Sequence, residues 1–409
     1  MKNKLIKAML SLGLLKSLDY IFPLAIIPLV IHSLGVSLYG VTSYYLSLSL
    51  LYVVVVDFGF NIYGVQKLAL MKESNRIKRF ITSSFIIRSI LLLVIVIPTH
   101  IILVHISPEK MSLNGGEYTF LLIAILNICN LQWFFQVKEK FRLMISISLL
   151  FRLMAFLLTF IFVKNESDIY AYINVLILMY GGPYIIHLIY FLFKYSDVKM
   201  ARLNKDYILV LVKMSGSIFG YRIANAAILP CFNYAFGFLM TSTEFGVMSL
   251  VQRIFGAVIN FSSPILQALI PFFADMKRKD ASNFKAIYLK SFFYTLFLSF
   301  LLCILSITGT YFLIYTGVLG AGVALSDLFP HILIMFAIVP HVINSLQSQV
   351  LLLKNSRHIV NYAVLNSLIL VGIFFIVGLA FNLSTIYFIG FYLTTYYFMS
   401  SYLFWGAKR

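Results

Sequence analysis

Long, uninterrupted apolar segments are the feature that most restricts how this chain folds. Twelve of them follow one another along the 409 residues, and each is long enough to cross a bilayer, which takes about 20 apolar residues in an α-helix. The connections between them are short, so no large domain outside the membrane fits. We place the predicted spans at residues 10–32, 38–66, 80–104, 117–137, 143–163, 169–193, 207–233, 243–273, 287–315, 327–353, 358–380 and 384–405.

The composition excludes a soluble protein. Hydrophobic residues make up 61% of the chain and charged residues 11%, whereas a soluble domain carries about 25% charged residues. The apolar residues come in continuous runs rather than in alternation, which also excludes a transmembrane β-barrel. Three lysines precede the first apolar segment as in a signal peptide, but no small-residue cleavage site follows, so we expect a retained first helix.

Lysine and arginine are distributed unevenly over the connections. With a cytoplasmic N-terminus, 24 of the 32 Lys and Arg residues lie in cytoplasmic segments, and two, Lys110 and Lys164, lie on the opposite side. Cytoplasmic connections of membrane proteins carry such an excess of positive charge. A missed or additional span would mix the two groups, so the distribution also supports the number of spans. We therefore expect both termini in the cytoplasm.

The chain has the pattern of a tandem repeat. Leu38-Tyr39-Gly40-Val41 precedes the second span and Glu244-Phe245-Gly246-Val247 precedes the eighth, at an offset of 206 residues. At the same offset, Lys16 aligns with Arg222 and Asp19 with Asn225. Six spans begin and end on one side of a membrane, so two copies form parallel repeats, as in many transporters with a central site.

The predicted fold is therefore all-α, with twelve transmembrane helices in two parallel six-helix halves around a central cavity. We expect an N-terminal lobe over residues 1–200 and a C-terminal lobe over residues 201–409.

Charged side chains inside the spans are the strongest indication of function. Such charges are costly in a bilayer and usually face a water-filled cavity or pair with one another. Six cations and two acids fall within the predicted spans: Lys16, Arg88, Arg152, Lys213, Arg222 and Arg253, with Asp19 and Asp57. The excess of cations indicates an anionic cargo.

The eighth span has the clearest polar face. Ser249, Arg253, Gly256, Asn260, Ser263 and Gln267 recur at steps of three and four residues, which places them on one side of a helix. This face either lines the cavity or packs as a polar seam against a neighbouring helix. The predicted substrate-binding residues are Lys16, Arg222, Arg253, Asn225, Asn260, Gln267 and Asn61.

Asp57 and Asp19 are the candidates for coupling transport to an ion. Asp57 lies deep enough in its span to act as a proton carrier, and its alternative role is that of a buried partner for Arg88 or Lys16. Arg88 and Arg152 are secondary candidates, for which structural pairing is the favoured interpretation.

Other polar residues have two interpretations each. Lys213 lies near the end of its span, where a long side chain can extend to the interface. Asn127 and Asn130 in the fourth span suit sugar hydroxyls, because amides donate and accept hydrogen bonds, and they equally suit bonds between helices. The cysteines and histidines form no metal-binding pattern, and we expect no metal or cofactor.

Three stretches carry a resemblance to a known family. They run from Leu38 through Asp57-Phe58-Gly59-Phe60-Asn61, over Trp133-Phe134-Phe135-Gln136 with Lys138, and from Glu244 to Pro271. With them the chain resembles the Wzx-type O-antigen flippases, in the polysaccharide transport branch of the multidrug/oligosaccharidyl-lipid/polysaccharide exporter superfamily. The resemblance covers essentially the whole chain, although none of these stretches is a catalytic signature.

The resemblance implies a protein of the bacterial inner membrane that moves undecaprenyl-pyrophosphate-linked O-antigen repeat units from the cytoplasmic to the periplasmic leaflet. The implied partners are this lipid-linked oligosaccharide and membrane lipids, with an O-antigen polymerase and a chain-length regulator as further candidates, and no nucleic acid. Alternating access, coupled to a proton or sodium gradient, is the expected mechanism. The chain lacks a Walker motif, so we expect a transporter without ATP hydrolysis rather than an enzyme.

Two other functions remain open as alternatives. A multidrug antiporter of the same superfamily would need acids for cationic drugs, whereas cations predominate in these spans. The second alternative is a membrane O-antigen polymerase. Families of such enzymes usually carry a long periplasmic loop or an acidic catalytic cluster, and this sequence shows neither.

Overall fold

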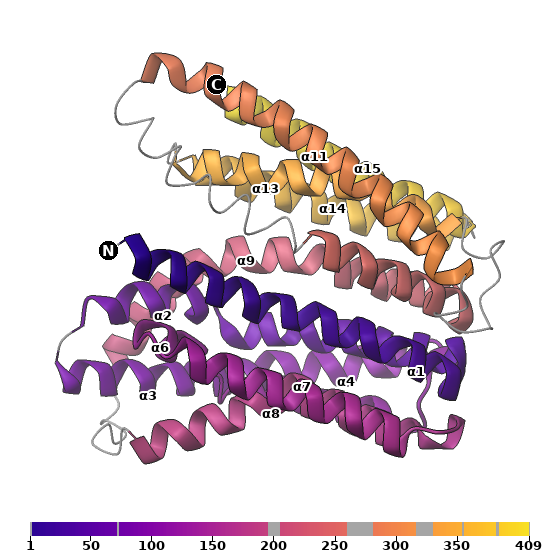
Figure 1. Ribbon diagram of the computed structural model, residues 1–409, viewed down its shortest axis with the longest axis horizontal. Helices are drawn as coiled ribbons and strands as arrows, with labels where there is room; N and C mark the ends of the chain where they lie inside the picture. The colour runs from indigo at the N-terminus through magenta and orange to yellow at the C-terminus, as the bar shows by residue number, and fades with distance from the viewer. Residues whose placement is uncertain are drawn as a thin grey trace. The chain divides into compact units, whose positions relative to one another are not determined.

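The chain is helical throughout the part that the structure describes. The computed structural model describes residues 2–71, 73–194, 205–259, 281–315, 330–353, 356–381 and 384–408, and these residues contain no β-strand. The helices of the first half are α1 (Lys2–Asp57), α2 (Phe60–Ala69), α3 (Ser74–Leu91), η1 (Leu92–Val96), α4 (Ile97–Ile106), η2 (Glu109–Met111), η3 (Gly116–Phe120), α5 (Leu121–Asn127), α6 (Gln132–Val137), α7 (Phe141–Phe162), η4 (Glu166–Asp168) and α8 (Ile169–Lys194). Those of the second half are α9 (Lys205–Leu239), a helix over residues 242–259, α11 (Ala281–Tyr315), η5 (Leu333–Ala337), α13 (Ile338–Leu353), α14 (Arg357–Phe381) and α15 (Thr385–Lys408) (Figure 1).

The predicted all-helical membrane architecture is confirmed. Each predicted span falls on one or more of these helices, with residues 260–273 of the eighth span and 327–329 of the tenth outside the described part. Within the described residues, eight helical segments are long and apolar enough to cross a membrane, and the first, Ile21–Ala69, covers the second predicted span and the later part of the first. The protein is therefore a multi-pass membrane protein.

Contacts divide the chain into two compact units. The N-terminal unit comprises Met1–Leu18 and Val41–Pro230, and the C-terminal unit comprises Asp19–Gly40 and Cys231–Arg409. The boundaries fall inside α1 and α9, because each of these long helices contributes one part to each unit. The division into lobes near residue 200 stays a prediction.

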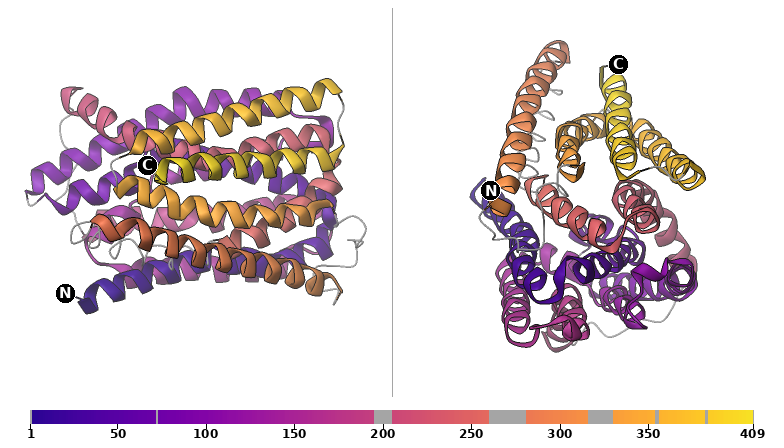
Figure 2. Two further views of the ribbon diagram at one scale, coloured as in Figure 1. Left: turned by 90° about the horizontal axis from the view of Figure 1, so that it is seen from above. Right: turned by 90° about the vertical axis from the view of Figure 1, so that its right-hand side faces the viewer.

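Each unit is a bundle of packed helices. In the N-terminal unit α8 packs against α7 and α5, and α2 packs against α6; in the C-terminal unit α15 packs against α13 and α14, and α11 against α13. The long helices of the N-terminal unit lie side by side (Figures 1 and 2). Large apolar side chains such as Phe160 of α7 and Phe297 of α11 are exposed, as expected for surfaces that face lipid.

A glycine joins the first two predicted spans without a separate loop. Gly35 has φ 76° and ψ 166° and kinks α1 sharply. A side chain at this φ would be strained, whereas glycine tolerates it because it has no Cβ. The chain therefore turns from one span into the next within a single residue.

The two repeat motifs meet in a reciprocal contact inside the C-terminal unit. A Cβ added to Gly40 would overlap the carbonyl oxygen of Ser242, and a Cβ added to Gly246 would overlap the carbonyl oxygen of Val36. Gly40 and Gly246 are 206 residues apart, as are Val36 and Ser242, so each contact is the repeat equivalent of the other. The hydroxyls of Ser37 and Ser242 add a hydrogen bond of 2.7 Å beside them. Such self-complementary pairing is the mark of a two-fold axis.

A capping box starts the helix over residues 242–259. The carboxylate of Glu244 accepts a hydrogen bond from the Thr241 amide at 2.8 Å, and the Thr241 hydroxyl accepts one from the Glu244 amide at 3.2 Å. Threonine followed three residues later by glutamate produces this pattern, which satisfies two amides that have no partner within the helix.

Two predicted spans are not continuous helices, and this corrects the sequence interpretation. The second span breaks after Asp57, where Phe58 (φ 47°) and Gly59 (φ 80°) are both left-handed. The fourth span breaks over residues 128–131, between α5 and α6. The long-range contacts that hold these breaks come from α3. The breaks therefore cannot be predicted from the residues around them.

Alanine at Gly40 or Gly246 should destabilise the protein. The added methyl group meets backbone rather than a flexible side chain, so relief requires the two segments to separate, which we expect to cost about 1–3 kcal/mol. Thermal unfolding of the purified protein measures the effect.

Gly309→Ala is the matched control, because a Cβ at Gly309 in α11 meets open space. The double variant should lose less than the sum of the two single losses, since both substitutions open one contact. Wild-type stability in both single variants would contradict the reciprocal contact.

Candidate functional site

An arginine in the last turn of α3 forms a buried ion pair with the end of α1. Arg88 Nη2 lies 3.2 Å from Asp57 Oδ1, and each side chain is 1% exposed. A charge at this depth is costly unless it is paired and hydrogen-bonded. The structure therefore brings together two of the charges that the sequence placed inside spans.

Arg88 also binds the backbone of the second helix break. Its Nη1 donates to the carbonyl oxygen of Asn130 at 2.7 Å and to that of Ile128 at 3.3 Å. Carbonyl groups at a helix end have no partner within the helix, and within a membrane there is no water to bind them. The planar guanidinium carries several donors, which lets one side chain serve both breaks.

Two asparagines complete the hydrogen bonding between the breaks. Asn127 Nδ2 donates to the carbonyl oxygen of Val53 in α1 at 3.0 Å, and its Oδ1 accepts from Asn130 Nδ2 at 3.1 Å. Asn130 Oδ1 accepts from the Gln132 amide at 3.0 Å at the start of α6. These amides, which the sequence left open between sugars and helix contacts, bond to the protein itself.

Aromatic rings enclose the guanidinium. Arg88 Cζ lies 5.3 Å from the centre of the Phe60 ring and 5.9 Å from that of Trp133, distances typical of cation–π contacts. Trp133 Nε1 donates to the carbonyl oxygen of Asn130 at 3.1 Å, and Gly64 of α2 leaves room for the indole, since a Cβ there would lie 2.8 Å from it. We refer to Asp57, Arg88, Asn127, Asn130 and Trp133 as the Arg88 network.

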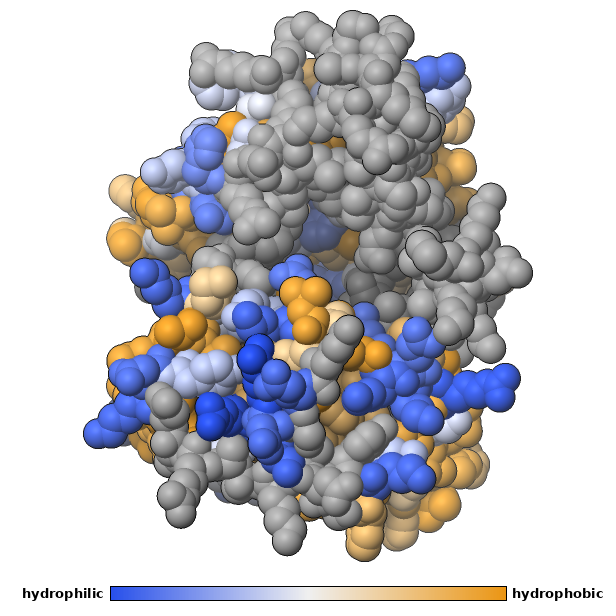
Figure 3. All heavy atoms as spheres, turned by 90° about the vertical axis from the view of Figure 1, so that its left-hand side faces the viewer, coloured by the Kyte–Doolittle hydropathy of each residue, from blue (hydrophilic) through white to orange (hydrophobic). Residues whose placement is uncertain are grey.

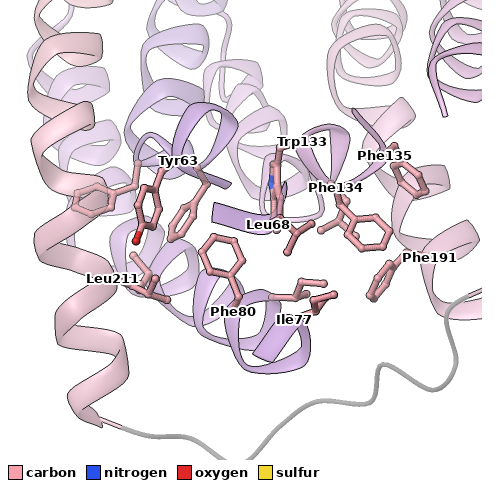
Figure 4. Packing of buried hydrophobic residues seen from close by; sticks show 14 of the residues in the cluster. Tyr63, Leu68, Ile77, Phe80, Trp133, Phe134, Phe135, Phe191 and Leu211 are labelled. Atoms are coloured by element: carbon pink, nitrogen blue, oxygen red, sulfur yellow. The ribbon is translucent and has the colours of Figure 1, made fainter. Parts of the chain in front are cut away.

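A larger aromatic cluster adjoins the network and joins the ends of six helices. Its core, part of which Figure 4 shows, draws on the chain around the break, α2, α3, α6, α7, α8 and α9: Phe58, Phe60, Tyr63, Leu68, Ile77, Phe80, Ile81, Ile87, Leu131, Trp133, Phe134, Phe135, Met144, Phe191 and Leu211. Phe80 packs edge-on against Trp133, with ring centres 5.5 Å apart. Both helix breaks are thus fixed in a rigid apolar setting.

The remaining predicted residues of the N-terminal unit are placed as follows. Asn61 is half-buried, and its backbone N–H donates to Asp57 Oδ2 at 3.4 Å. Arg152 in α7 is buried, and its Nη1 donates to the carbonyl oxygen of Ser148 at 3.0 Å. Lys213 in α9 is exposed.

The other predicted substrate-binding residues are described in part. Lys16 and Asp19 lie on α1, and Arg222 and Asn225 lie on α9, but their side chains are outside the described part of the structure. Asn260 and Gln267 are outside it altogether. Their role at a cavity stays a prediction.

Arg253 is half-buried on the helix over residues 242–259. Its neighbour Gln252 is buried and donates to Asn233 Oδ1 of α9 at 2.8 Å. The described residues include no group of three or more His, Cys, Asp or Glu side chains suited to a metal ion.

The sequence analysis did not identify Trp133 as a partner of the Arg88 network. Trp133 could have been found from the sequence, because the asparagines and the glutamine of the fourth span directly precede it.

Removing the Arg88 side chain should destabilise the protein strongly. In Arg88→Met the carboxylate of Asp57 and two backbone carbonyls lose their partner, and breaking a buried pair costs about 3–5 kcal/mol. Asp57→Asn should also destabilise the protein, because it leaves the Arg88 charge buried without its counter-charge. Thermal unfolding followed by tryptophan fluorescence measures both variants, since Trp133 lies in the network.

Lys164→Met controls for the loss of an exposed cation on α7's C-terminal side. This control should unfold at the wild-type temperature. If Arg88→Met did so too, the network would not be what holds the breaks.

Comparisons with known proteins bear on the family and the fold. A family model described as polysaccharide biosynthesis protein matches residues 5–277. No curated protein matches the chain significantly in sequence.

Solved structures show the fold. An inward-facing multidrug resistance MATE family transporter of the MOP superfamily is similar with a TM-score of 0.70 at 13% identity, covering 98% of this chain and 96% of that one. A MATE structure in the straight conformation has a TM-score of 0.54 at 12% identity, covering 99% of this chain and 94% of that one. The fold is therefore that of the MATE transporters, and the chain belongs to the polysaccharide biosynthesis protein family.

Proposed function

We propose that this protein translocates undecaprenyl-pyrophosphate-linked O-antigen repeat units across the bacterial inner membrane, from the cytoplasmic to the periplasmic leaflet. The observation that carries the proposal is the match to the polysaccharide biosynthesis family over residues 5–277, in a chain with the fold of membrane transporters. A member of this family with a transporter's fold is suited to moving a polysaccharide precursor rather than to making a glycosidic bond.

The chemistry of the cargo fits the charges within the spans. A pyrophosphate bridging lipid and sugar is anionic and binds arginine and lysine through charge-assisted hydrogen bonds. Lys16, Arg222 and Arg253 are the proposed ligands of this group, and the proposed contacts of the sugars are the amides of Asn61, Asn225, Asn260 and Gln267. Arg253 is half-buried, which suits a cation that takes up a ligand.

The distribution of surface charge supports the proposed orientation. The aromatic cluster brings together one set of helix ends in the N-terminal unit, and hydrophilic side chains gather over this end in Figure 3. The exposed cations beside the cluster are Arg76, Arg79, Lys138, Lys140, Arg142, Lys194 and Lys205. By the distribution of positive charge, this is the cytoplasmic end.

The proposed mechanism is alternating access driven by an ion gradient. The sequence predicts Asp19 and Asp57 as the coupling residues, and this role stays a prediction for both. The ion pair of Asp57 with Arg88 supports the other role considered for Asp57, which is structural, because protonation of the carboxylate would leave Arg88 buried without its counter-charge.

A multidrug antiporter is the second candidate, because a multidrug resistance MATE transporter shares the fold. The discriminating feature is the sign of the charge within the spans, where six cations stand against two acids. Cationic drugs require acids, so this balance favours the anionic cargo.

Arg222→Ala and Arg253→Ala should each abolish surface O-antigen in a strain that depends on this protein, because the pyrophosphate loses a cationic ligand. Immunoblotting of surface polymer measures export, and immunoblotting of membranes checks that the variants accumulate.

Lys164→Ala, which removes an exposed cation outside the spans, is the matched control and should retain full export. Full surface polymer in both arginine variants would refute the binding role. Resistance to cationic drugs that depends on the protein, without any effect on surface polymer, would favour the antiporter.

A further inference from the structure

We propose that the hydrogen-bonded amide pair of Asn233 and Gln252 positions Arg253 for its anionic ligand. This role rests on the proposed function, in which Arg253 binds the pyrophosphate of the cargo. Gln252 Nε2, on the helix over residues 242–259, donates to Asn233 Oδ1 of α9 at 2.8 Å. Arg253 is the next residue along that helix, and all three residues belong to the C-terminal unit.

Both amides are buried within segments that we expect to cross the bilayer. Asn233 is 5% exposed and Gln252 7%. Burying amides is costly even when they are bonded to each other, and hydrogen bonds between membrane helices stabilise a fold only modestly. Unlike the amides of the Arg88 network, this pair serves no helix break, because α9 and the helix over residues 242–259 both continue through it. Stability alone therefore gives little reason for two amides at this contact.

The first repeat has apolar residues at the equivalent positions. At the offset of 206 residues, Asn233 aligns with Ile27 and Gln252 with Leu46. Ile27 is 2% exposed and Leu46 1%, so the first repeat buries hydrocarbon where the second repeat buries amides. The residue after Leu46 is a serine, whereas the residue after Gln252 is Arg253. The amide pair and the cation thus occur together, in the second repeat.

The amide pair helps to fix the rotation of the helix over residues 242–259. Gln252 faces α9, and Phe255 faces α13, where its ring centre lies 6.1 Å from that of His341. Successive residues of an α-helix are about 100° apart around the axis. Arg253 therefore lies about 100° from the α9 contact and about 160° from the α13 contact, on a third side of the helix.

An amide pair sets this rotation more sharply than an apolar contact does. A hydrogen bond requires its donor to point at the acceptor within a limited range of angles, whereas apolar attraction has no direction. The acceptor is itself held in place, because the neighbouring Phe232 packs edge-on against Tyr392 of α15, with ring centres 5.0 Å apart. The bond therefore sets the direction in which Arg253 leaves the helix.

A phosphate ligand makes this direction important. Arginine binds phosphate oxygens best through two parallel N–H donors, which requires the guanidinium and the phosphate to be aligned. Arg253 is half-buried, so a ligand can reach the side chain while the surrounding protein restricts it. Asn233 and Gln252 are thus positioning residues, which act on the ligand through Arg253.

Two double variants separate packing from positioning. Asn233→Ile with Gln252→Leu installs the residues of the first repeat and removes the bond, and we call it the apolar variant. Asn233→Gln with Gln252→Asn, the exchanged variant, keeps an amide pair. Both should unfold near the wild-type temperature. If the apolar variant does not accumulate in membranes, Gln252→Met, which keeps the length of the side chain, replaces it.

Binding of farnesyl pyrophosphate, a short isoprenyl pyrophosphate, tests the positioning. Isothermal titration calorimetry of the full-length protein in lipid nanodiscs measures the Kd, with farnesol as the uncharged control. The exchanged variant should bind like the wild type. The apolar variant should bind about tenfold more weakly, since misplacing a binding group by about 1 Å costs up to about 100-fold. Arg253→Ala should bind more weakly still.

Wild-type affinity in the apolar variant, with weak binding by Arg253→Ala, would overturn the positioning role and leave Arg253 as the ligand. Weak binding by the exchanged variant would overturn it as well, because that variant retains an amide pair.

A measurement without cargo separates this proposal from the proposed function. Arg253→Cys, made in the wild-type, apolar and exchanged backgrounds, reacts with a negatively charged methanethiosulfonate reagent at a rate that reports the direction of position 253. Each parent protein gives the background from the three native cysteines. The rate should change in the apolar background and stay at the wild-type value in the exchanged one.

Equal rates in all three backgrounds would refute the positioning role, whatever the protein binds. A changed rate in the apolar background, in a protein whose wild type does not bind farnesyl pyrophosphate, would instead count against the proposed function. The amide pair would then still set the direction of position 253.

Discussion

The described N-terminal unit depends on the contacts that the Arg88 guanidinium makes. Within a bilayer, a backbone group released from a helix has no water to bind, so a helix can break only where the protein supplies donors and acceptors. Arg88 meets that demand for two breaks at once, through the Asp57 carboxylate on one side and the carbonyls of Ile128 and Asn130 on the other. Its charge, in turn, is tolerated because these partners and two aromatic rings surround it. Breaks and charge therefore stabilise each other.

The helical architecture could be predicted because apolar length is a local property. Runs of about 20 apolar residues need no knowledge of their neighbours to be recognised, and the predicted spans fall on helices of the described chain. The breaks at Phe58–Gly59 and at residues 128–131 could not be predicted in this way. Both lie within apolar surroundings, and their stability comes from a side chain on α3 that is distant in sequence.

The candidate site shows the same division. The sequence identifies which charges lie at membrane depth, and it named Arg88 among the possible partners of Asp57. It does not decide between pairing and facing a cavity, because that choice depends on how helices rotate against one another. Asn127 illustrates the limit: its partners are the Val53 carbonyl in α1 and Asn130 across the helix break, and neither partner can be read from the apolar segment around it.

The reciprocal glycine contact has a consequence for the origin of the chain. Gly40 meets Ser242, and Gly246 meets Val36, the residue that corresponds to Ser242 in the first repeat. A gene encoding only six helices would yield a subunit carrying one copy of this segment, and two such subunits could make the same contact across their symmetry axis. Duplication and fusion would then preserve an interface that already existed. On this view, the contact already required a glycine at this position when the gene encoded a single copy of the segment.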